Sequence, residues 1–500
     1  MTKLKLQRFV LLPPRGLISD TVMSTPPVLS FFLHTLETVR TAAVPARALA
    51  AAKVATKMKV LDSIAETGAK LVEMSVEDVA DLQTEHPGLR IVPEVFYYPH
   101  RAPRPELASA PKAAAAAVKI DIKVVSKADG KPVAGATVVA FTNYAQKVGD
   151  EGTTDKQGRV RLTLGGASKK VERLYIYAEH SFWNALLKNV MLKSGTQLPL
   201  LPIDLSFIDE LRFFYGASGL TAGKGVKVGV IDTGIAPHPD LKVSGGQNTV
   251  VGENPNDFGD NGEGHGTHVA GMIAARSTPP NGVRGLAPGV ELRSYRVFGK
   301  NAKGASNFAI SKAINVAVAD GCDLINMSLG GGDSDEATRS AIANAREHGT
   351  LVLASSGNDG RQPVSFPAND PRSVAISALG RTGTYPSGTV EVGEVMKPFG
   401  TDPKDYIAAF SNVGPEILLT GPGVGIISTF PGNKYAVMDG TSMACPAATG
   451  AAAKVLSANP ALLAQTRDQA RSDAMLQSIL SAAGTLGFPG TLEGKGLIKI

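Results

Sequence analysis

The sequence has few of the residues that mark disulfide-rich, membrane-spanning or nucleic-acid-binding proteins. Its 500 residues include two cysteines, one tryptophan and 6% aromatic residues. No run approaches the ~18 uninterrupted apolar residues that a membrane helix needs. The net charge of +6 is small for this length, and no block of Lys and Arg concentrates it. We therefore expect no disulfide framework, no membrane span and no nucleic-acid partner.

Two further absences concern the thiols and the amino terminus. Cys322 and Cys445 lie among small or apolar neighbours, which favours buried free thiols over a redox or metal role. Residues 9–12 are apolar, but Pro13 and Pro14 end that run far short of a signal-peptide core. Without a secretory signal we expect a cytoplasmic location, with export by another route as the alternative.

What the chain does contain is a globular composition, 43% hydrophobic with 54 glycines, over a length that suggests several domains. Patterns of strands and turns divide it into four parts. We expect an N-terminal region over residues 1–100, a Pro- and Ala-rich linker over 101–117, a β-sandwich over 118–200 and a larger domain over 201–500.

The N-terminal region contains a small α+β unit at about residues 56–97. Residues 60–64 and 69–74 predict two strands, and Ser75, three residues before Asp78, is typical of a helix start. Pro87-Gly88 ends that helix, and residues 89–92 predict another strand.

From residue 201, short apolar runs alternate with helical patterns. The runs cover residues 226–231, 292–297, 324–327, 351–354 and 374–378, and helices are expected over 309–320 and 336–348. This alternation predicts an α/β fold in which a parallel sheet is covered by helices on both faces. In such sheets functional groups gather at the carboxyl ends of the strands.

Three Gly-rich motifs supply a carboxylate, an imidazole and a hydroxyl. Asp232 lies in Val-Ile-Asp-Thr-Gly, His265 opens His-Gly-Thr-His, and Ser442 lies in Gly-Thr-Ser-Met-Ala. Acyl transfer by a serine needs these three groups: the hydroxyl attacks, the imidazole takes its proton, and the carboxylate orients the imidazole. Asn358, in Ser-Ser-Gly-Asn after a predicted strand, adds an amide donor suited to an oxyanion.

Two other interpretations of these motifs are weaker. Asp-Thr-Gly is also typical of aspartic proteases, but those need two carboxylates and no second copy occurs here. His265 and His268 could form a metal pair, yet no Glu follows at ligand spacing. We expect a structural hydrogen-bonding role for His268.

Together the four motifs resemble the subtilisin-like serine proteases (the subtilase family) over about residues 211–500. The resemblance implies an endopeptidase that uses an acyl-enzyme, with Asp232, His265 and Ser442 as the catalytic triad and Asn358 in the oxyanion hole. It also implies that a peptide substrate pairs with Ser328, Leu329 and Gly330. Ser356 and Gly357 are also expected to lie beside the substrate, and Asp359 at the specificity pocket. Asp240 is a possible calcium ligand.

The upstream regions carry weaker resemblances. The α+β unit is similar to the inhibitory propeptides of subtilases, which implies a self-processed zymogen whose N-terminal region acts as an intramolecular inhibitor. The β-sandwich resembles transthyretin-like domains appended to other enzymes. Over a hundred residues separate Glu94 from the peptidase core, so we expect a segment near residues 198–204 to fill the cleft.

The resemblance implies protein or peptide substrates and no required cofactor. The rival hypothesis is a catalytically silent binding module of subtilase type, whose cleft the upstream domains block permanently.

Overall fold

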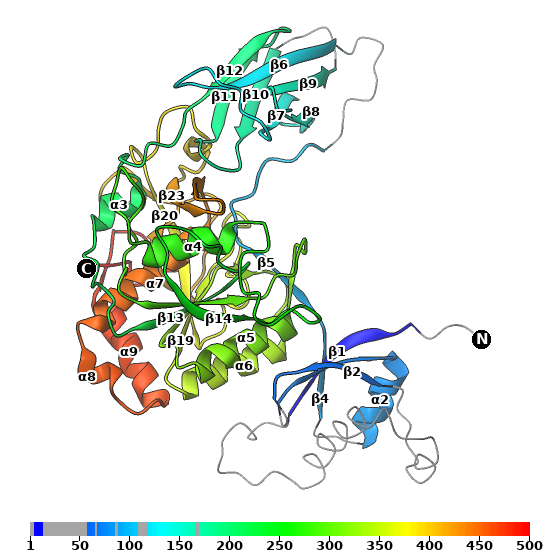
Figure 1. Ribbon diagram of the computed structural model, residues 1–500, viewed down its shortest axis with the longest axis vertical. Helices are drawn as coiled ribbons and strands as arrows, with labels where there is room; N and C mark the ends of the chain where they lie inside the picture. The colour runs from blue at the N-terminus through cyan, green and yellow to red at the C-terminus, as the bar shows by residue number, and fades with distance from the viewer. Residues whose placement is uncertain (1–4, 14–57, 66–67, 86–88, 109–117, 166–169) are drawn as a thin grey trace.

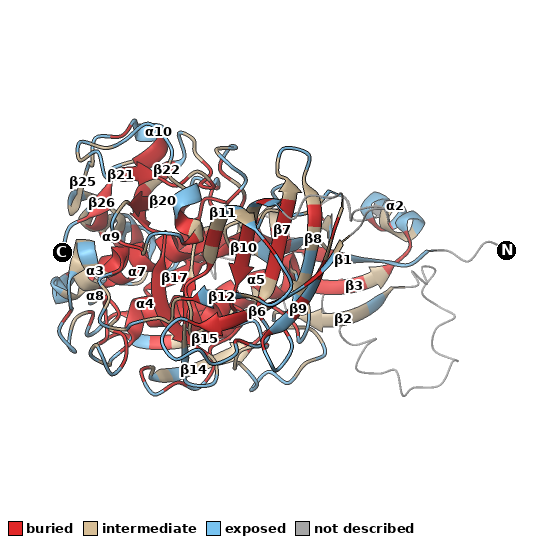
Figure 2. Ribbon diagram, turned by 90° about the horizontal axis from the view of Figure 1, so that it is seen from above, coloured by how far each residue is buried: buried red, intermediate tan, exposed pale blue. Residues whose placement is uncertain are grey.

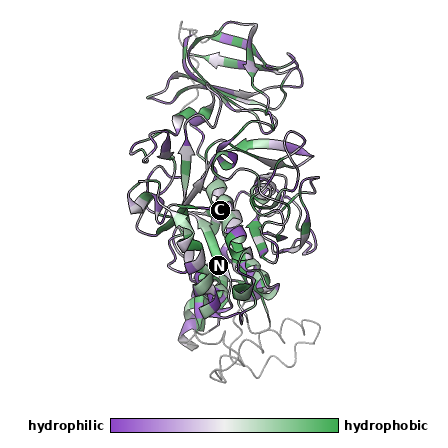
Figure 3. Cartoon of the chain, turned by 90° about the vertical axis from the view of Figure 1, so that its left-hand side faces the viewer, coloured by the Kyte–Doolittle hydropathy of each residue, from purple (hydrophilic) through white to green (hydrophobic). Residues whose placement is uncertain are grey.

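The computed structural model describes residues 5–13, 58–65, 68–85, 89–108, 118–165 and 170–500 (Figure 1). A small N-terminal unit and a β-domain lie at opposite ends of a central α/β body. Buried and hydrophobic residues concentrate in the sheet and helices of that central body (Figures 2 and 3). Within the described residues, no helix has both the length and the apolar character needed to cross a bilayer.

The central body is built on a ten-stranded sheet in the order β14-β15-β13-β17-β19-β20-β22-β26-β25, with β21 paired to β20. Its seven neighbouring pairs from β14 to β26 are parallel, which confirms the predicted parallel sheet. The strands are β13 (Lys227–Asp232), β14 (Val243–Asn248), β15 (Glu291–Arg296), β17 (Leu324–Met327), β19 (Leu351–Ser355), β20 (Ser373–Arg381), β21 (Asp405–Ile407), β22 (Ile417–Pro422), β25 (Ala483–Gly484) and β26 (Leu497–Ile498).

Helices cover both faces because the strands are apolar on both sides. Val228 and Val230 of β13 pack in one core with α4 and α7, whereas Ile231 packs in a second core with α5 and α6. The helices are α3 (Glu210–Tyr215), α4 (His265–Ala274), α5 (Asn307–Ala319), α6 (Glu336–Glu347), α7 (Thr441–Ser457), α8 (Pro460–Leu463), α9 (Gln469–Ser481) and α10 (Gly490–Glu493). A hairpin of β23 (Ile426–Phe430) and β24 (Lys434–Met438) and a short 3-10 helix, η2 (Val390–Gly393), complete the body.

The N-terminal unit is a four-stranded sheet in the order β2-β3-β1-β4 with one helix, α2. Ser75 caps α2 as predicted, and its Oγ accepts the Asp78 N–H at 3.1 Å. The elements are β1 (Gln7–Leu12), β2 (Lys59–Ser63), β3 (Lys70–Met74), α2 (Val76–Glu85) and β4 (Arg90–Pro93).

Strand β1 extends this unit beyond its predicted limits of about 56–97. Residues 9–12 are apolar without alternation because the sheet is buried on both faces. Phe9 and Leu11 pack toward α2, whereas Val10 and Leu12 pack with Phe308 of α5. The second face thus holds the N-terminal unit against the central body.

Two ion pairs flank this apolar contact. Arg90 of β4 lies 2.7 Å from Glu336 of α6, and Lys312 of α5 lies 2.7 Å from Asp62 of β2. The unit is therefore seated on α5 and α6, on one side of the large sheet.

The β-domain consists of two sheets, β12-β6-β9 and β11-β10-β7-β8, whose inner faces share one core. Likeness to transthyretin domains remains a prediction. The strands are β6 (Val118–Ser126), β7 (Thr137–Asn143), β8 (Val148–Thr153), β9 (Arg159–Leu164), β10 (Lys170–Tyr177), β11 (Ala185–Met191) and β12 (Thr196–Leu200).

Trp183, the single tryptophan of the chain, fixes the β-domain to the central body. The side chain is 2% exposed and joins the core formed by α4 and α7. Its ring meets Phe207 edge-on with 5.3 Å between centroids. This contact buries a large apolar surface at the boundary between the two parts.

We predict that Trp183→Ala lowers the free energy of unfolding by about 3–5 kcal/mol, because the substitution leaves a cavity in a packed core. Trp183→Phe, which fills part of the space, loses less. Thermal and urea unfolding followed by circular dichroism, in a Ser442→Ala background chosen against the self-cleavage that the resemblance implies, measures both. An unchanged unfolding transition in Trp183→Ala would show that the contact does not hold the domains together.

Candidate active site

The carboxylate and the imidazole of the predicted triad are in direct contact. Asp232 ends β13 and His265 begins α4, so both lie at the carboxyl edge of the sheet. His265 Nδ1 lies 2.8 Å from Asp232 Oδ1 and 3.0 Å from Oδ2, and both residues are fully buried. A carboxylate here selects the tautomer protonated at Nδ1. His265 Nε2 has no hydrogen-bond partner among the described residues, and is available to take a proton.

Ser442 is the second residue of α7, where the backbone N–H groups have no partner within the helix. Its Oγ donates to the Ser328 carbonyl at 2.9 Å, and its own carbonyl accepts from Ser328 Oγ at 2.9 Å. The Ser442 N–H donates to the carbonyl of His100 at 3.3 Å. The hydroxyl is therefore held by Ser328 in this structure, while the N–H faces a peptide carbonyl.

Asn358 is oriented by the first residue of α7. Its Oδ1 accepts the N–H of Thr441 at 3.0 Å and the Thr441 hydroxyl at 2.8 Å. The amide Nδ2 is buried and has no hydrogen-bond partner among the described residues. A Cβ placed on Gly440 would clash with the His100 carbonyl oxygen and lie 3.2 Å from Asn358 Nδ2, so both groups converge at this glycine.

A short strand from upstream of the central body, β5 (Phe96–Pro99), crosses the cleft between two body strands. It pairs antiparallel with β16 (Ala305–Ser306) on one side and with β18 (Leu329–Gly330) on the other. Main-chain pairing of this kind is how an extended peptide binds to exposed sheet edges. The predicted peptide-binding residues therefore contact a segment of their own chain.

The pairing continues past β5 through the candidate active site. The His100 N–H donates to the Ser328 carbonyl at 3.3 Å, and the Ala102 N–H donates to the Asp439 carbonyl at 2.9 Å. Between these bonds, the His100 carbonyl faces the Ser442 N–H. Residues 96–102 thus cross the site as an extended peptide.

This arrangement corrects the prediction that residues 198–204 fill the cleft. Leu198 and Leu200 are buried in the core of the β-domain instead. Only Glu94 and Val95 separate β4 from β5, so the cleft strand follows the N-terminal unit directly. The β-domain is inserted after the strand, and its length does not prevent the strand from reaching the cleft.

The His100 side chain fills a buried recess. Ring Nδ1 lies 2.7 Å from Ser355 Oγ, and Ser365 Oγ lies 3.5 Å from Nε2. A Cβ on Gly330 would come within 2.6 Å of the ring, so only glycine leaves room there. Burial lowers the pKa of His100 to about 4, and the nearby Asp359 carboxylate acts in the opposite direction.

Other predicted residues have supporting positions. Ser356 Oγ donates to the Asn412 carbonyl at 3.1 Å, and the Gly357 N–H donates to Thr441 Oγ1 at 3.3 Å, so neither is seen to hydrogen-bond to the cleft segment. Asp359 lines a cavity together with Asn358 and accepts from Asn412 Nδ2 at 2.8 Å. The contacts of Ser355 and Thr441 were not predicted, although both residues lie within the motifs that contain Asn358 and Ser442.

The residues considered for metal or thiol chemistry are buried and contact other parts of the protein. Asp240 Oδ2 accepts from the Val283 N–H at 2.9 Å and from the Tyr435 hydroxyl at 3.0 Å. The described residues contain no cluster of three or more His, Cys, Asp or Glu arranged to hold a metal. His268 Nε2 meets the carbonyls of Ile426 and Ala436 at 3.1 and 3.2 Å. Both cysteines, at positions 322 and 445, are buried free thiols, and burial raises each pKa to about 12.

The site therefore combines a buried carboxylate–imidazole pair, a serine at a helix N-terminus whose N–H binds a peptide carbonyl, and a buried amide N–H, that of Asn358, that has no hydrogen-bond partner among the described residues. These groups suffice for nucleophilic attack on a carbonyl with stabilisation of the resulting oxyanion.

Comparison with known proteins agrees with this geometry. The Subtilase family profile matches residues 223–496, more than half of the chain. Subtilisin DY of Bacillus licheniformis is 39% identical over 283 residues, which cover 56% of this chain and 90% of that protein. Subtilisin BL of Lederbergia lenta is 39% identical over 281 residues, covering 56% and 91% respectively. The chain belongs to the subtilase family.

Proposed function

We propose that the protein is a serine endopeptidase that cleaves peptide bonds through an acyl-enzyme intermediate. The observation that carries this proposal is the peptide carbonyl of His100, held beside the Ser442 N–H by a strand paired on both edges. Membership of the subtilase family and the likeness to subtilisins support the same reaction class.

In the proposed reaction, Ser442 Oγ attacks the carbonyl carbon and His265 Nε2 takes the hydroxyl proton. Asp232 keeps the imidazole oriented and stabilises the imidazolium. The oxyanion accepts hydrogen bonds from the Ser442 N–H and Asn358 Nδ2. When the C–N bond breaks, the imidazolium returns its proton to the leaving amine. Water then attacks the ester by the reverse steps and releases the acid.

This chemistry uses only side chains and main-chain N–H groups, so we propose that it needs no cofactor. Asp240, the possible calcium ligand, already accepts two protein hydrogen bonds through Oδ2. Any calcium requirement would concern stability and not the reaction.

We further propose that the chain is made as a zymogen that cuts itself between His100 and Arg101. The His100 carbonyl is the one presented to Ser442, and Arg101 is held beyond it by Glu263, whose main-chain carbonyl accepts from the guanidinium at 2.8 Å. The N-terminal unit, seated on α5 and α6, delivers β5 to the cleft and acts as an intramolecular inhibitor.

A fluorophosphonate probe separates this enzyme from a silent binding module, because it reacts only with an activated serine. We predict that the wild type is labelled after incubation, whereas Ser442→Ala is not. Ser457→Ala, the same substitution at the far end of α7, is the matched control and keeps its labelling. Absence of labelling in a form freed of its N-terminal region would support the silent module.

Self-cleavage predicts a defined product. Purified wild type should lose residues 1–100 and show Arg101 as its new N-terminal residue, while Ser442→Ala stays intact. Intact-mass measurement with N-terminal sequencing identifies the bond. A wild type that remains whole while it hydrolyses added peptides, or that is cut elsewhere, contradicts the proposed register.

The buried His100 makes docking of the cleft segment pH-dependent. Its pKa is about 4 when docked and near 6.5 when free, so the free segment binds the proton more readily between these values. Docking is therefore strongest above pH ~6.5 and weakens as the pH falls toward 4.

Hydrogen exchange of the segment covering His100 and Ala102 in full-length Ser442→Ala measures this effect, after correction for the intrinsic pH dependence of exchange. We expect lower protection at pH 4.5 than at pH 7.5. Burial also raises the pKa of Asp439 to about 6, so the control is His100→Gln, which leaves Asp439 in place. If His100→Gln loses as much protection at pH 4.5, the pH dependence comes from a group other than His100.

A further inference from the structure

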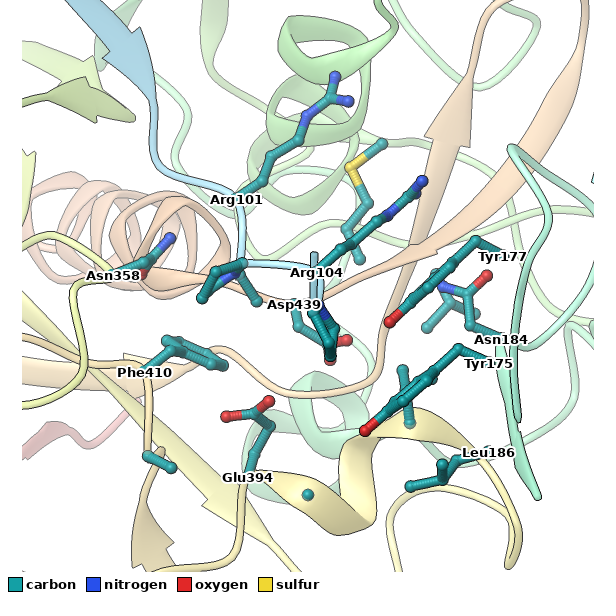
Figure 4. A pocket seen from close by; sticks show the side chains of 18 of the residues that line it. Arg101, Arg104, Tyr175, Tyr177, Asn184, Leu186, Asn358, Glu394, Phe410 and Asp439 are labelled. Carbon is teal, nitrogen blue, oxygen red and sulfur yellow. The ribbon is translucent and has the colours of Figure 1, made fainter. Parts of the chain in front are cut away.

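A cavity of about 710 Å³ extends from Asn358 to the β-domain (Figure 4). One wall comes from the central body and includes Asn358, Glu394 and Asp439. The other comes from β10 and includes Tyr175 and Tyr177. Residues 101–105, which follow the carbonyl presented to Ser442, run through the space between them.

The β-domain wall is unusual because its sheet is apolar on both faces. The outer face of an antiparallel sheet in a sandwich is commonly polar. Here the inner face packs in the sandwich core, while the outer face carries a second buried cluster. That cluster consists of Val139, Phe141, Tyr175, Tyr177 and Leu186. An aromatic surface of this kind, turned toward a cleft, is suited to binding an extended chain.

The linker follows this surface away from the catalytic centre. The Arg104 guanidinium lies 4.4 Å from the centroid of the Tyr177 ring, although the residue as a whole remains exposed. Leu107 then packs against the aromatic cluster, and the Ala108 N–H donates to the Lys147 carbonyl at 3.0 Å. Successive residues beyond the bond that faces Ser442 therefore have defined contacts on the β-domain.

Charge near Tyr177 favours a cation. Glu179 and Asp439 line the cavity where the guanidinium stacks on the ring, and Glu179 attracts the Arg104 guanidinium. Burial raises the pKa of Glu394, which also lines the cavity, to about 8, so this group carries little charge at neutral pH. Attraction between a cation and an aromatic face adds to the attraction by the acidic groups. Two basic residues, Lys147 and Arg173, also line the cavity, but their charged groups lie over another ring, each 3.6 Å from the centroid of Tyr144.

The two walls are fixed relative to each other. Besides Trp183, the Leu186 N–H donates to the Gly388 carbonyl at 2.9 Å, and the Val390 N–H donates to the Asn184 carbonyl at 3.1 Å. These main-chain bonds tie β11 and its approach to the segment around η2. The groove is thus preformed, which lowers the entropic cost of binding an extended chain.

We propose that the β-domain extends the substrate cleft and binds the substrate on the carboxyl side of the cleaved bond, with a Lys or Arg side chain, four residues after that bond, on the face of Tyr177. The inference rests on the proposed peptidase function and on the register set by His100. The linker occupies this groove in the uncut chain, and substrates occupy it afterwards.

Quenched-fluorescence peptides with the sequence of residues 96–108 test the proposal on enzyme that is produced as the full chain and then allowed to process itself. The fourth residue after the bond is Arg, Ala or Glu in three versions, and a short peptide ends one residue before it. We expect kcat/KM to be about 2–5-fold higher for Arg than for Ala, as for an exposed cation–aromatic contact, and lowest for Glu. The still-attached linker competes equally with all versions, so the ratios are independent of it.

Two variants assign the effect to the β-domain. In Tyr177→Leu the ratio between Arg and Ala peptides should fall close to one. Phe213→Leu removes another ring that lies under a guanidinium, that of Arg381 at 4.3 Å, and does not line the cavity. This control should keep the wild-type ratio.

The outcomes distinguish the two levels of the argument. If the short peptide is cleaved and the Arg, Ala and Glu versions of the long peptide are cleaved at equal rates, the inference is overturned and the peptidase function stands. Failure to cleave any of the peptides, the short one included, would overturn the proposed function and the inference with it. Retention of the ratio in Tyr177→Leu would place the recognition outside the β-domain.

Discussion

The pairing of β5 between β16 and β18 is the constraint on which the rest of the site depends. Main-chain hydrogen bonds on both edges determine which residue reaches Ser442, the proposed nucleophile, and they place the His100 carbonyl at the Ser442 N–H. The close approach requires glycine at positions 330 and 440, where a Cβ would meet the His100 ring and carbonyl. Glycine is thus needed at these two positions because the bound segment lies where a side chain would otherwise be.

The same strand connects three parts of the molecule in a fixed order. Two residues upstream lies β4, so the N-terminal unit must sit on α5 and α6 when β5 is in place. Downstream, the chain leaves the candidate active site along the aromatic face of β7 and β10. The β-domain therefore lies where the carboxyl side of a bound peptide would emerge. Its anchor, Trp183, is buried in the core of the central body and keeps it there.

The sequence allowed prediction of those features that depend on local pattern. Short motifs or periodicity predicted the parallel sheet, α5 and α6 within a few residues, the cap at Ser75 and the contact between Asp232 and His265.

What could not be predicted depends on partners far apart in the chain. Strand β5 has only four residues, and it pairs with two-residue strands more than 200 positions away. Its register is set by main-chain hydrogen bonds, which every residue type can make, so no side-chain pattern marks the register in the sequence. The expectation for residues 198–204 failed because it placed the cleft segment next to the peptidase core in sequence. That β1 belongs to the N-terminal unit was not predicted for a similar reason, since its neighbours β3 and β4 follow about 60 to 80 residues later.

A crystal structure of full-length Ser442→Ala tests most directly whether the chain lies across its own catalytic centre. The account predicts that residues 96–99 pair with 305–306 and 329–330, and that the His100 carbonyl lies within hydrogen-bond distance of the residue 442 N–H. It also predicts continuous density from His100 into the groove beside Tyr177. An empty cleft, or a different segment or register in it, would contradict the account.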